Sequence, residues 1–262
     1  MKESWDKLIA RAELLTAKSD GAKELLVFYA HLLRAQKEIY ESLRSRKNWL
    51  PTGVLEDDLL VLRGMLPELL RVAQKHGTPS LIEMAEALSQ AHDDEIDVML
   101  LMQWRAPSDI QFFGKALLQP YGRWLAESGG RPVDRVFERH ESRCPFCGGV
   151  PQVSFLHIGE ASSESGNRSL ICSTCLTVWL FRRVVCVHCG EEQPSKLGYF
   201  HSPEYDHVRI EACDSCKRYI KGIDLTVSGL AIPLVDEVAA APLDLWADEH
   251  GYARIERNLV GL

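Results

Sequence analysis

The sequence contains no apolar run long enough to cross a membrane. The uncharged, mostly apolar stretches of the 262-residue chain, such as residues 27–33 and 98–104, are all well short of the about 20 consecutive apolar residues that a membrane-spanning helix needs. The first ten residues, MKESWDKLIA, also lack the apolar segment of a secretory signal peptide. These absences predict a cytoplasmic protein without stable membrane insertion.

An excess of positive charge is also missing. The chain carries 30 lysine and arginine residues against 37 aspartate and glutamate residues, a formal net charge of −7. Because phosphate binding requires a concentrated positive field, this balance argues against a nucleic acid partner. The sequence has no glycine-rich phosphate loop, no Gly-x-Ser-x-Gly elbow and no His-Glu-x-x-His motif. We therefore expect a protein that is not an enzyme.

The first 143 residues contain no cysteine, and most of them have the pattern of amphipathic helices. Apolar side chains recur at helical spacing along residues 4–16, 20–44, 55–76 and 112–125. After the turn-rich residues 129–132, short β-like runs alternate with Gly, Ser, Pro and Asn. These patterns predict an α+β fold with four segments: a helical domain (1–130), a first four-cysteine ribbon (131–184), a second four-cysteine ribbon (185–228) and a C-terminal helical tail (229–262).

The eight cysteines occur as four Cys-x-x-Cys pairs, and none is left over. In a reducing cytosol such pairs favour metal binding over disulfides, because two intervening residues let a tight turn direct both thiolates at one tetrahedral metal. Gly148 and Gly190 follow the two opening pairs and suit a left-handed turn, whereas Leu176 and Lys217 break this pattern in the closing pairs. The pairs are Cys144/Cys147, Cys172/Cys175, Cys186/Cys189 and Cys213/Cys216.

An internal duplication predicts which pairs share a metal. The interval from Cys147 to Cys172 holds 24 residues and that from Cys189 to Cys213 holds 23, whereas only 10 residues separate Cys175 from Cys186. Each copy reads as a knuckle, a β-hairpin and a second knuckle, the arrangement of zinc ribbons and rubredoxin. We predict one metal ion in the first copy and one in the second. Zinc is the usual occupant of four-cysteine sites, but a single iron also fits them, so the ligands leave iron or zinc open.

Three roles remain possible for such modules. Closed coordination by four cysteines leaves no position for a substrate, which favours a metal-stabilised module that binds another protein. A zinc-ribbon protein that binds nucleic acid is one alternative, but residues 141–224 carry nine basic and ten acidic side chains. A rubredoxin-like electron carrier is the other alternative if the metal is iron.

From residue 112 onward the chain resembles the formate dehydrogenase accessory (formation) proteins. The resemblance lies in FFGKALLQPYGRWLAE, RCPFCGGVPQVS, RSLICSTCLTVWLFRRVVCVHCGE, ACDSCKRYIKGIDL and APLDLWADEHGY. It implies a cytoplasmic accessory protein that assists maturation of respiratory formate dehydrogenase by contacting its catalytic subunit. It also implies rubredoxin-like iron sites, and the functional positions that it carries over are the eight cysteines. The oligomeric state stays open.

Overall fold

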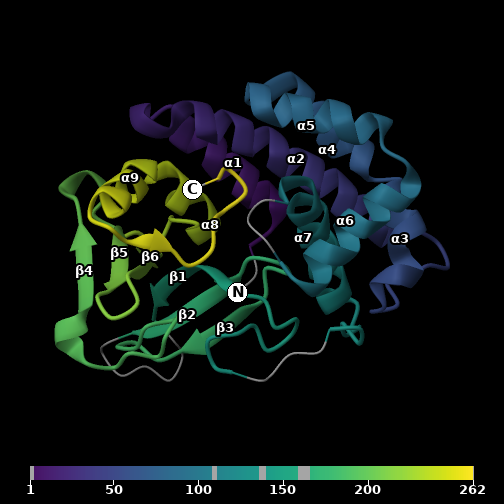
Figure 1. Ribbon diagram of the computed structural model, residues 1–262. Coiled ribbons are helices and arrows are strands. Elements are labelled where there is room, and N and C mark those ends of the chain that lie inside the picture. The colour runs from purple at the N-terminus through teal and green to yellow at the C-terminus, as the bar shows by residue number, and fades with distance from the viewer. Residues whose placement is uncertain (1–2, 108–110, 136–139, 159–165, 262) are drawn as a thin grey trace.

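The computed structural model describes residues 3–107, 111–135, 140–158 and 166–261, and the first two of these ranges are largely helical (Figure 1). Within the four described ranges, no helix is both long and apolar enough to span a bilayer. The helical elements are α1 (Trp5–Thr16), the 3₁₀-helix η1 (Asp20–Ala22), α2 (Lys23–Ser45), α3 (Leu55–Arg63), α4 (Leu66–His76), α5 (Pro79–Gln90), α6 (Asp93–Arg105) and α7 (Phe112–Glu127).

The helix boundaries follow from local chemistry. Ser4 caps α1, and its hydroxyl oxygen accepts a hydrogen bond from the backbone N–H of Lys7 at 3.3 Å. Thr78 caps α5 in the same way, directly before Pro79 at the first helical position. Pro67 lies in the first turn of α4, where its missing N–H costs no helical hydrogen bond, so the segment from residue 55 to 76 forms two helices.

A single mixed sheet follows the helices. The strands are β1 (Pro151–His157), β2 (Asn167–Cys172), β3 (Val178–Phe181), β4 (Leu197–His201), β5 (Val208–Cys213), β6 (Arg218–Asp224) and β7 (Ala253–Arg254), with 3₁₀-helices η2 (Pro194–Lys196) and η3 (Pro203–Tyr205) on either side of β4. The strand order is β3-β2-β1-β6-β5-β4, and β7 also pairs with β6. Pairs within each copy of the repeat are antiparallel, whereas β1 and β6 are parallel and join the two copies.

A buried glutamate reinforces this junction. Glu211 on β5 extends over Gly222 on β6 and accepts a hydrogen bond from the hydroxyl of Ser154 on β1 at 2.9 Å. The same carboxylate pairs with Arg168 on β2. A Cβ at position 222 would lie 2.4 Å from a carboxylate oxygen of Glu211. Glycine at this position therefore lets one side chain connect strands of both copies.

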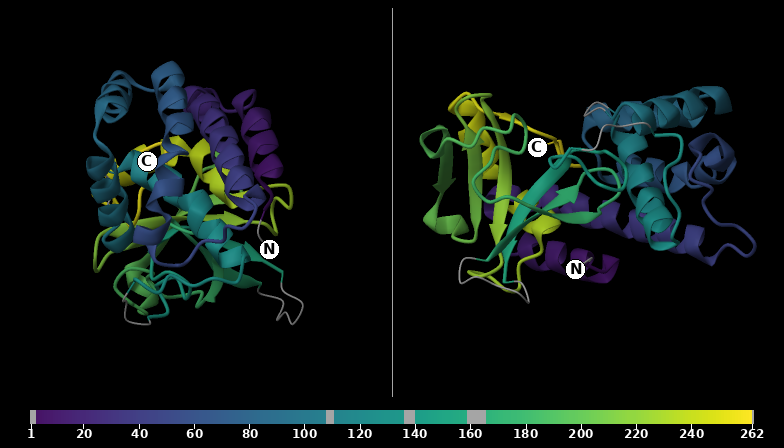
Figure 2. Two further views of the ribbon diagram at one scale, coloured as in Figure 1. Left: turned by 90° about the vertical axis from the view of Figure 1, so that its right-hand side faces the viewer. Right: turned by 90° about the horizontal axis from the view of Figure 1, so that it is seen from below.

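The C-terminal segment packs between the sheet and the helical domain. Its helices are α8 (Pro233–Ala239) and α9 (Ala241–Glu249). Helix α8 contacts β1 and β6 on one side and α1 and α2 on the other, and α9 contacts β5. Figures 1 and 2 show these two yellow helices beside the sheet.

The sequence predicts the hairpins β1–β2 and β4–β5 and the helix α9, but it does not predict β3, β6 or α8. Strand β3 has only four residues, and buried Lys221 interrupts the apolar pattern of β6. Helix α8 has seven residues, all of them buried, so it lacks the alternation of polar and apolar faces that marks a surface helix. The predicted α+β class is confirmed, whereas the four segment limits stay a prediction.

Asp236 connects three parts of the fold. Its buried carboxylate accepts hydrogen bonds from Arg11 on α1 at 2.9 Å, from His207 before β5 at 2.8 Å and from the backbone N–H of Ile232 at 2.7 Å. The hydrogen bond to Asp236 raises the pKa of His207 above its usual value, although burial acts in the opposite direction. The charged imidazole therefore stabilises the folded protein.

We expect His207→Gln to reduce stability in a pH-dependent way. A histidine whose pKa is higher in the folded than in the unfolded state adds to the free energy of unfolding. This contribution is complete below the unfolded-state pKa of about 6.5 and is lost as the pH rises through the folded-state pKa. The loss of unfolding free energy in the variant should thus be largest near pH 6 and should shrink above it. Urea unfolding of both proteins from pH 6 to 9 measures this, with His201→Gln on β4 as an exposed control. A pH-independent difference would contradict the charge argument.

Candidate metal centres

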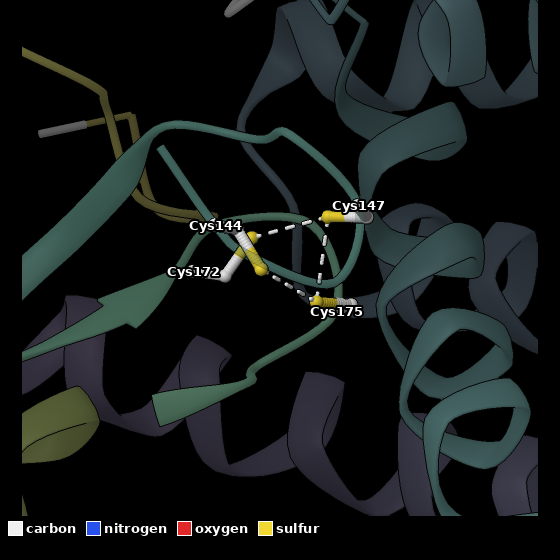
Figure 3. A group of neighbouring side chains, drawn as sticks. All are labelled: Cys144, Cys147, Cys172 and Cys175. Carbon is white, nitrogen blue, oxygen red and sulfur yellow. Dashed lines mark hydrogen bonds between the residues drawn. The ribbon is translucent and has the colours of Figure 1, made fainter. Parts of the chain in front are cut away.

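The first group of cysteines lies where the loop before β1 meets the turn between β2 and β3. Cys144 and Cys147 lie in the loop before β1, Cys172 ends β2 and Cys175 lies in the turn before β3. The Sγ–Sγ distance is 3.6 Å between Cys144 and Cys175. From Cys147 it is 3.5 Å to Cys172 and 3.4 Å to Cys175. Figure 3 shows the four sulfurs pointing toward one another. All four residues are fully buried.

The second group repeats this arrangement in the other half of the sheet. Cys186 and Cys189 lie in the loop after β3, Cys213 ends β5 and Cys216 lies in the turn before β6. The Sγ atoms of Cys186 and Cys216 are 3.7 Å apart, as are those of Cys189 and Cys213. Within each group all four sulfurs lie within 4.8 Å of one another. The structure thus assembles the two sets of four that the repeat predicts.

All four turns share one backbone conformation. The residue after the second cysteine has a positive φ in each: 69° at Gly148, 56° at Leu176, 76° at Gly190 and 54° at Lys217. The N–H of Lys217 donates to the carbonyl oxygen of Cys213 at 2.8 Å, as Gly148 and Gly190 do to the first cysteines of their turns. The expectation that Leu176 and Lys217 break the pattern is therefore wrong. The turn imposes the left-handed conformation even where a side chain makes it unfavourable.

The spacing of the sulfurs suits a tetrahedral metal. Metal–thiolate bonds of about 2.3 Å at tetrahedral angles place the sulfurs about 3.8 Å apart. Five sulfur–sulfur separations are 3.4 to 3.7 Å and none within a group exceeds 4.8 Å, which is close to this value and far longer than the disulfide bond length of about 2.05 Å. None of the eight cysteines forms a disulfide. Each group can therefore hold one metal ion, and both iron and zinc accept four thiolates.

Burial makes a cation necessary for the ionised form of the first group. Burial, together with hydrogen bonds from neighbouring thiols, raises the pKa of Cys175 well above the usual value for a thiol. Four thiolates in such a space would repel one another and lack solvation. A metal ion supplies the compensating positive charge and brings the thiols to the deprotonated form that ligation requires.

Helix α7 covers the first group. Gly122 faces Cys175 so closely that a Cβ at position 122 would lie 3.1 Å from the Cys175 Cβ. The amide of Gln119 donates to the carbonyl oxygen of Ser173, between the two cysteines of the turn, at 2.8 Å. The amide of Gln36 on α2 in turn bonds to the Gln119 side chain at 3.1 Å. The first cysteine group is therefore part of the joint between the helices and the sheet.

Other side chains of the quoted motifs support the modules without entering the cysteine groups. The Trp179 indole donates to the backbone oxygen of Glu141 at 3.0 Å, and Arg182 forms exposed ion pairs with Glu141 and Glu192. Lys221 and Tyr219 reach α9, where each contacts Asp244. Among the described residues, the histidines near the hairpins do not join either set of four sulfurs.

Similarity to known proteins covers the whole cysteine-containing half. Models of the FdhE central domain and the FdhE C-terminal domain match residues 143–183 and 184–260. A protein FdhE homolog from Aquifex aeolicus (strain VF5) is 38% identical over 196 residues, which cover 74% of this chain and 68% of that protein. The chain belongs to the FdhE family. An FdhE homolog from Pseudomonas aeruginosa is 32% identical over 236 residues, covering 83% of this chain and 73% of that protein.

The FdhE fold extends through the helical half. The crystal structure of the FdhE protein from Pseudomonas aeruginosa matches with a TM-score of 0.68 and 24% identity, and the match covers 99% of this chain and 97% of that one. At this identity the match shows the fold alone. Membership in the FdhE family confirms the resemblance to formate dehydrogenase formation proteins that the sequence motifs indicate.

Proposed function

We propose that this chain is a cytoplasmic accessory protein that assists maturation of respiratory formate dehydrogenase by contacting its catalytic subunit. The observation that carries the proposal is the pair of complete four-cysteine groups in a chain of the FdhE family. Four thiolates fill the coordination of a tetrahedral metal, so no position remains for water or formate. The metals then stabilise a folded surface, and the chain acts on a client rather than on a small substrate.

The two metal ions, iron or zinc, are held by the two repeats. Cys144, Cys147, Cys172 and Cys175 hold the first, and Cys186, Cys189, Cys213 and Cys216 hold the second. In this proposal residues 131–184 and 185–228 are metal-binding modules between the helical domain (1–130) and the C-terminal tail (229–262). The acidic chain, with its net charge of −7, has no nucleic acid partner.

Deletion of the gene tests this function. We expect respiratory formate dehydrogenase activity to be abolished or sharply reduced, while the client polypeptide is still made, because the defect lies in assembly. The gene in trans should restore activity, and Cys213→Ser should not, because loss of one ligand removes the metal that stabilises its module. Formate-dependent dye reduction in cell extracts and immunoblots of the catalytic subunit provide the two measurements.

Two further observations complete the experiment. The purified protein alone should oxidise no formate, and its capture from the native host should recover the formate dehydrogenase catalytic subunit. Normal formate oxidation in a deletion strain without a second copy of the gene would contradict the proposal. Loss of the client's messenger RNA in that strain would also contradict it, because the effect would then lie in expression.

A further inference from the structure

The two cysteine groups share a backbone design but differ in their exposure to solvent. The first group is completely buried, with each of Cys144, Cys147, Cys172 and Cys175 at 0% exposure. In the second group Cys186 and Cys213 are buried, whereas Cys216 is partly exposed and Cys189 is exposed. Duplication therefore produced one sealed site and one open site.

The sealing of the first site comes from its surroundings. Phe146 and Trp179 pack against its cysteines, and α7 covers Cys175 through Gly122. An incoming ligand must displace α7, Phe146 or Trp179 to reach the sulfurs. Metal release from this site therefore requires at least local unfolding.

The two repeats also differ at one matched position beside the sulfurs. The backbone N–H of Cys144 donates to the carbonyl oxygen of Gly149, and the N–H of Cys186 donates in the same way to that of Glu191. A Cβ at Gly149 would lie 2.9 Å from the Sγ of Cys172. Glu191 carries a full side chain at this place, and its carboxylate accepts from the hydroxyl of Ser215 at 2.6 Å. The second site is therefore less tightly enclosed than the first.

We propose that the second four-cysteine group is the exchangeable site of this protein, and that its metal is reached by soft ligands such as thiols and chelators past Cys189 and Cys216. The first group is a permanent structural site. A ligand could approach a metal held by this group in the folded protein, because Cys189 is exposed and Cys216 is partly exposed. This inference rests on the proposed metal binding and adds different roles for the two sites.

The test uses the full-length zinc-loaded protein and a chelator. With an excess of the coloured zinc chelator 4-(2-pyridylazo)resorcinol, we expect one equivalent of zinc to leave at least about tenfold faster than the other, the ratio that an opening cost of about 1.4 kcal/mol produces. Alkylation with iodoacetamide during the fast phase, followed by peptide mapping, should label Cys189 and Cys216 before any cysteine of the first group. Cys189→Ser should lose the fast phase and keep the slow one.

The outcomes separate the inference from the proposal on which it rests. Release of both equivalents at one rate, or earlier alkylation of Cys144, Cys147, Cys172 and Cys175, overturns the inference and leaves metal binding intact. A protein that takes up no zinc or iron overturns metal binding, and the inference with it. Alkylation mapping of the unaltered protein decides the order of release even if Cys189→Ser does not fold.

Discussion

Replacement of Cys172 by serine is expected to unfold the first module together with the part of the helical domain that packs on it. A structural metal held by four cysteines contributes about 10–16 kcal/mol of apparent binding free energy at neutral pH. This exceeds or equals the total stability of most proteins, about 5–15 kcal/mol. Because the first site lies beneath α7 and is tied to it through Gln119 and Ser173, its loss should reach the helical domain.

The second copy of the repeat provides a matched control. Cys213 occupies the position in the second group that Cys172 occupies in the first, at the end of the last strand of a hairpin. Cys213→Ser removes the same ligand type from a site whose outer cysteines reach solvent. We expect the damage to stay close to the second group and to leave α7 folded.

Hydrogen exchange measured by mass spectrometry distinguishes the two variants. Peptides of α7 should lose protection in Cys172→Ser and keep it in Cys213→Ser, and each variant should contain one metal equivalent fewer than the unaltered protein. The sequence alone predicts that both variants leave the helical domain folded, since it does not place α7 against the first site. If α7 keeps its full protection from exchange in both variants, the helical domain folds independently of the first site and this prediction is wrong.

The cysteine groups were predictable because their information is local and repeated. Spacing within each pair fixes the turn, and the matched intervals between pairs identify which turns meet. Helices were predictable for a similar reason, since one apolar face recurs along residues 20–44. The difference in exposure between Cys175 and Cys216 was not predictable, because Cys175 is covered by α7, which is distant in the sequence.

Buried charges were the main feature that the sequence concealed. Lysine and arginine are rarely fully buried, so Lys221 and Arg254 carry no sign of burial in a single sequence. Their partners, Glu237 and Asp244, lie on α8 and α9. The network exists only once β6 has entered the sheet between β1 and β5, a pairing that no local pattern specifies.

Lys221→Met is expected to destabilise the protein strongly. Lys221 is completely buried, and its ammonium group pairs with Asp244 and donates to the carbonyl oxygens of Glu237 and Ala240. Arg254 pairs with both acids, so the cluster holds two positive and two negative side chains. Removal of one partner from a buried ion pair costs about 3–5 kcal/mol, because a charge is left without compensation.

A second substitution tests whether charge balance is the cause. Asp244→Asn added to Lys221→Met leaves Arg254 with Glu237, a neutral pair, and keeps an oxygen that can accept from Tyr219, whose hydroxyl lies 2.8 Å from Asp244. We expect the double variant to be more stable than Lys221→Met alone. Lys37→Met, which breaks an exposed ion pair with Asp6, is the control and should change stability little.

Urea unfolding at pH 7 of the unaltered protein, Lys221→Met, Asp244→Asn and the double variant gives the four free energies needed for the comparison. If Asp244→Asn adds its own destabilisation to that of Lys221→Met, the four charges do not act as a balanced set, and lost packing explains the effect. If the second substitution recovers stability, an uncompensated charge is the cause. In that case the buried cluster fixes α8 and α9 onto the sheet and, through the contacts of α8 with α1 and α2, connects the cysteine modules to the helical domain.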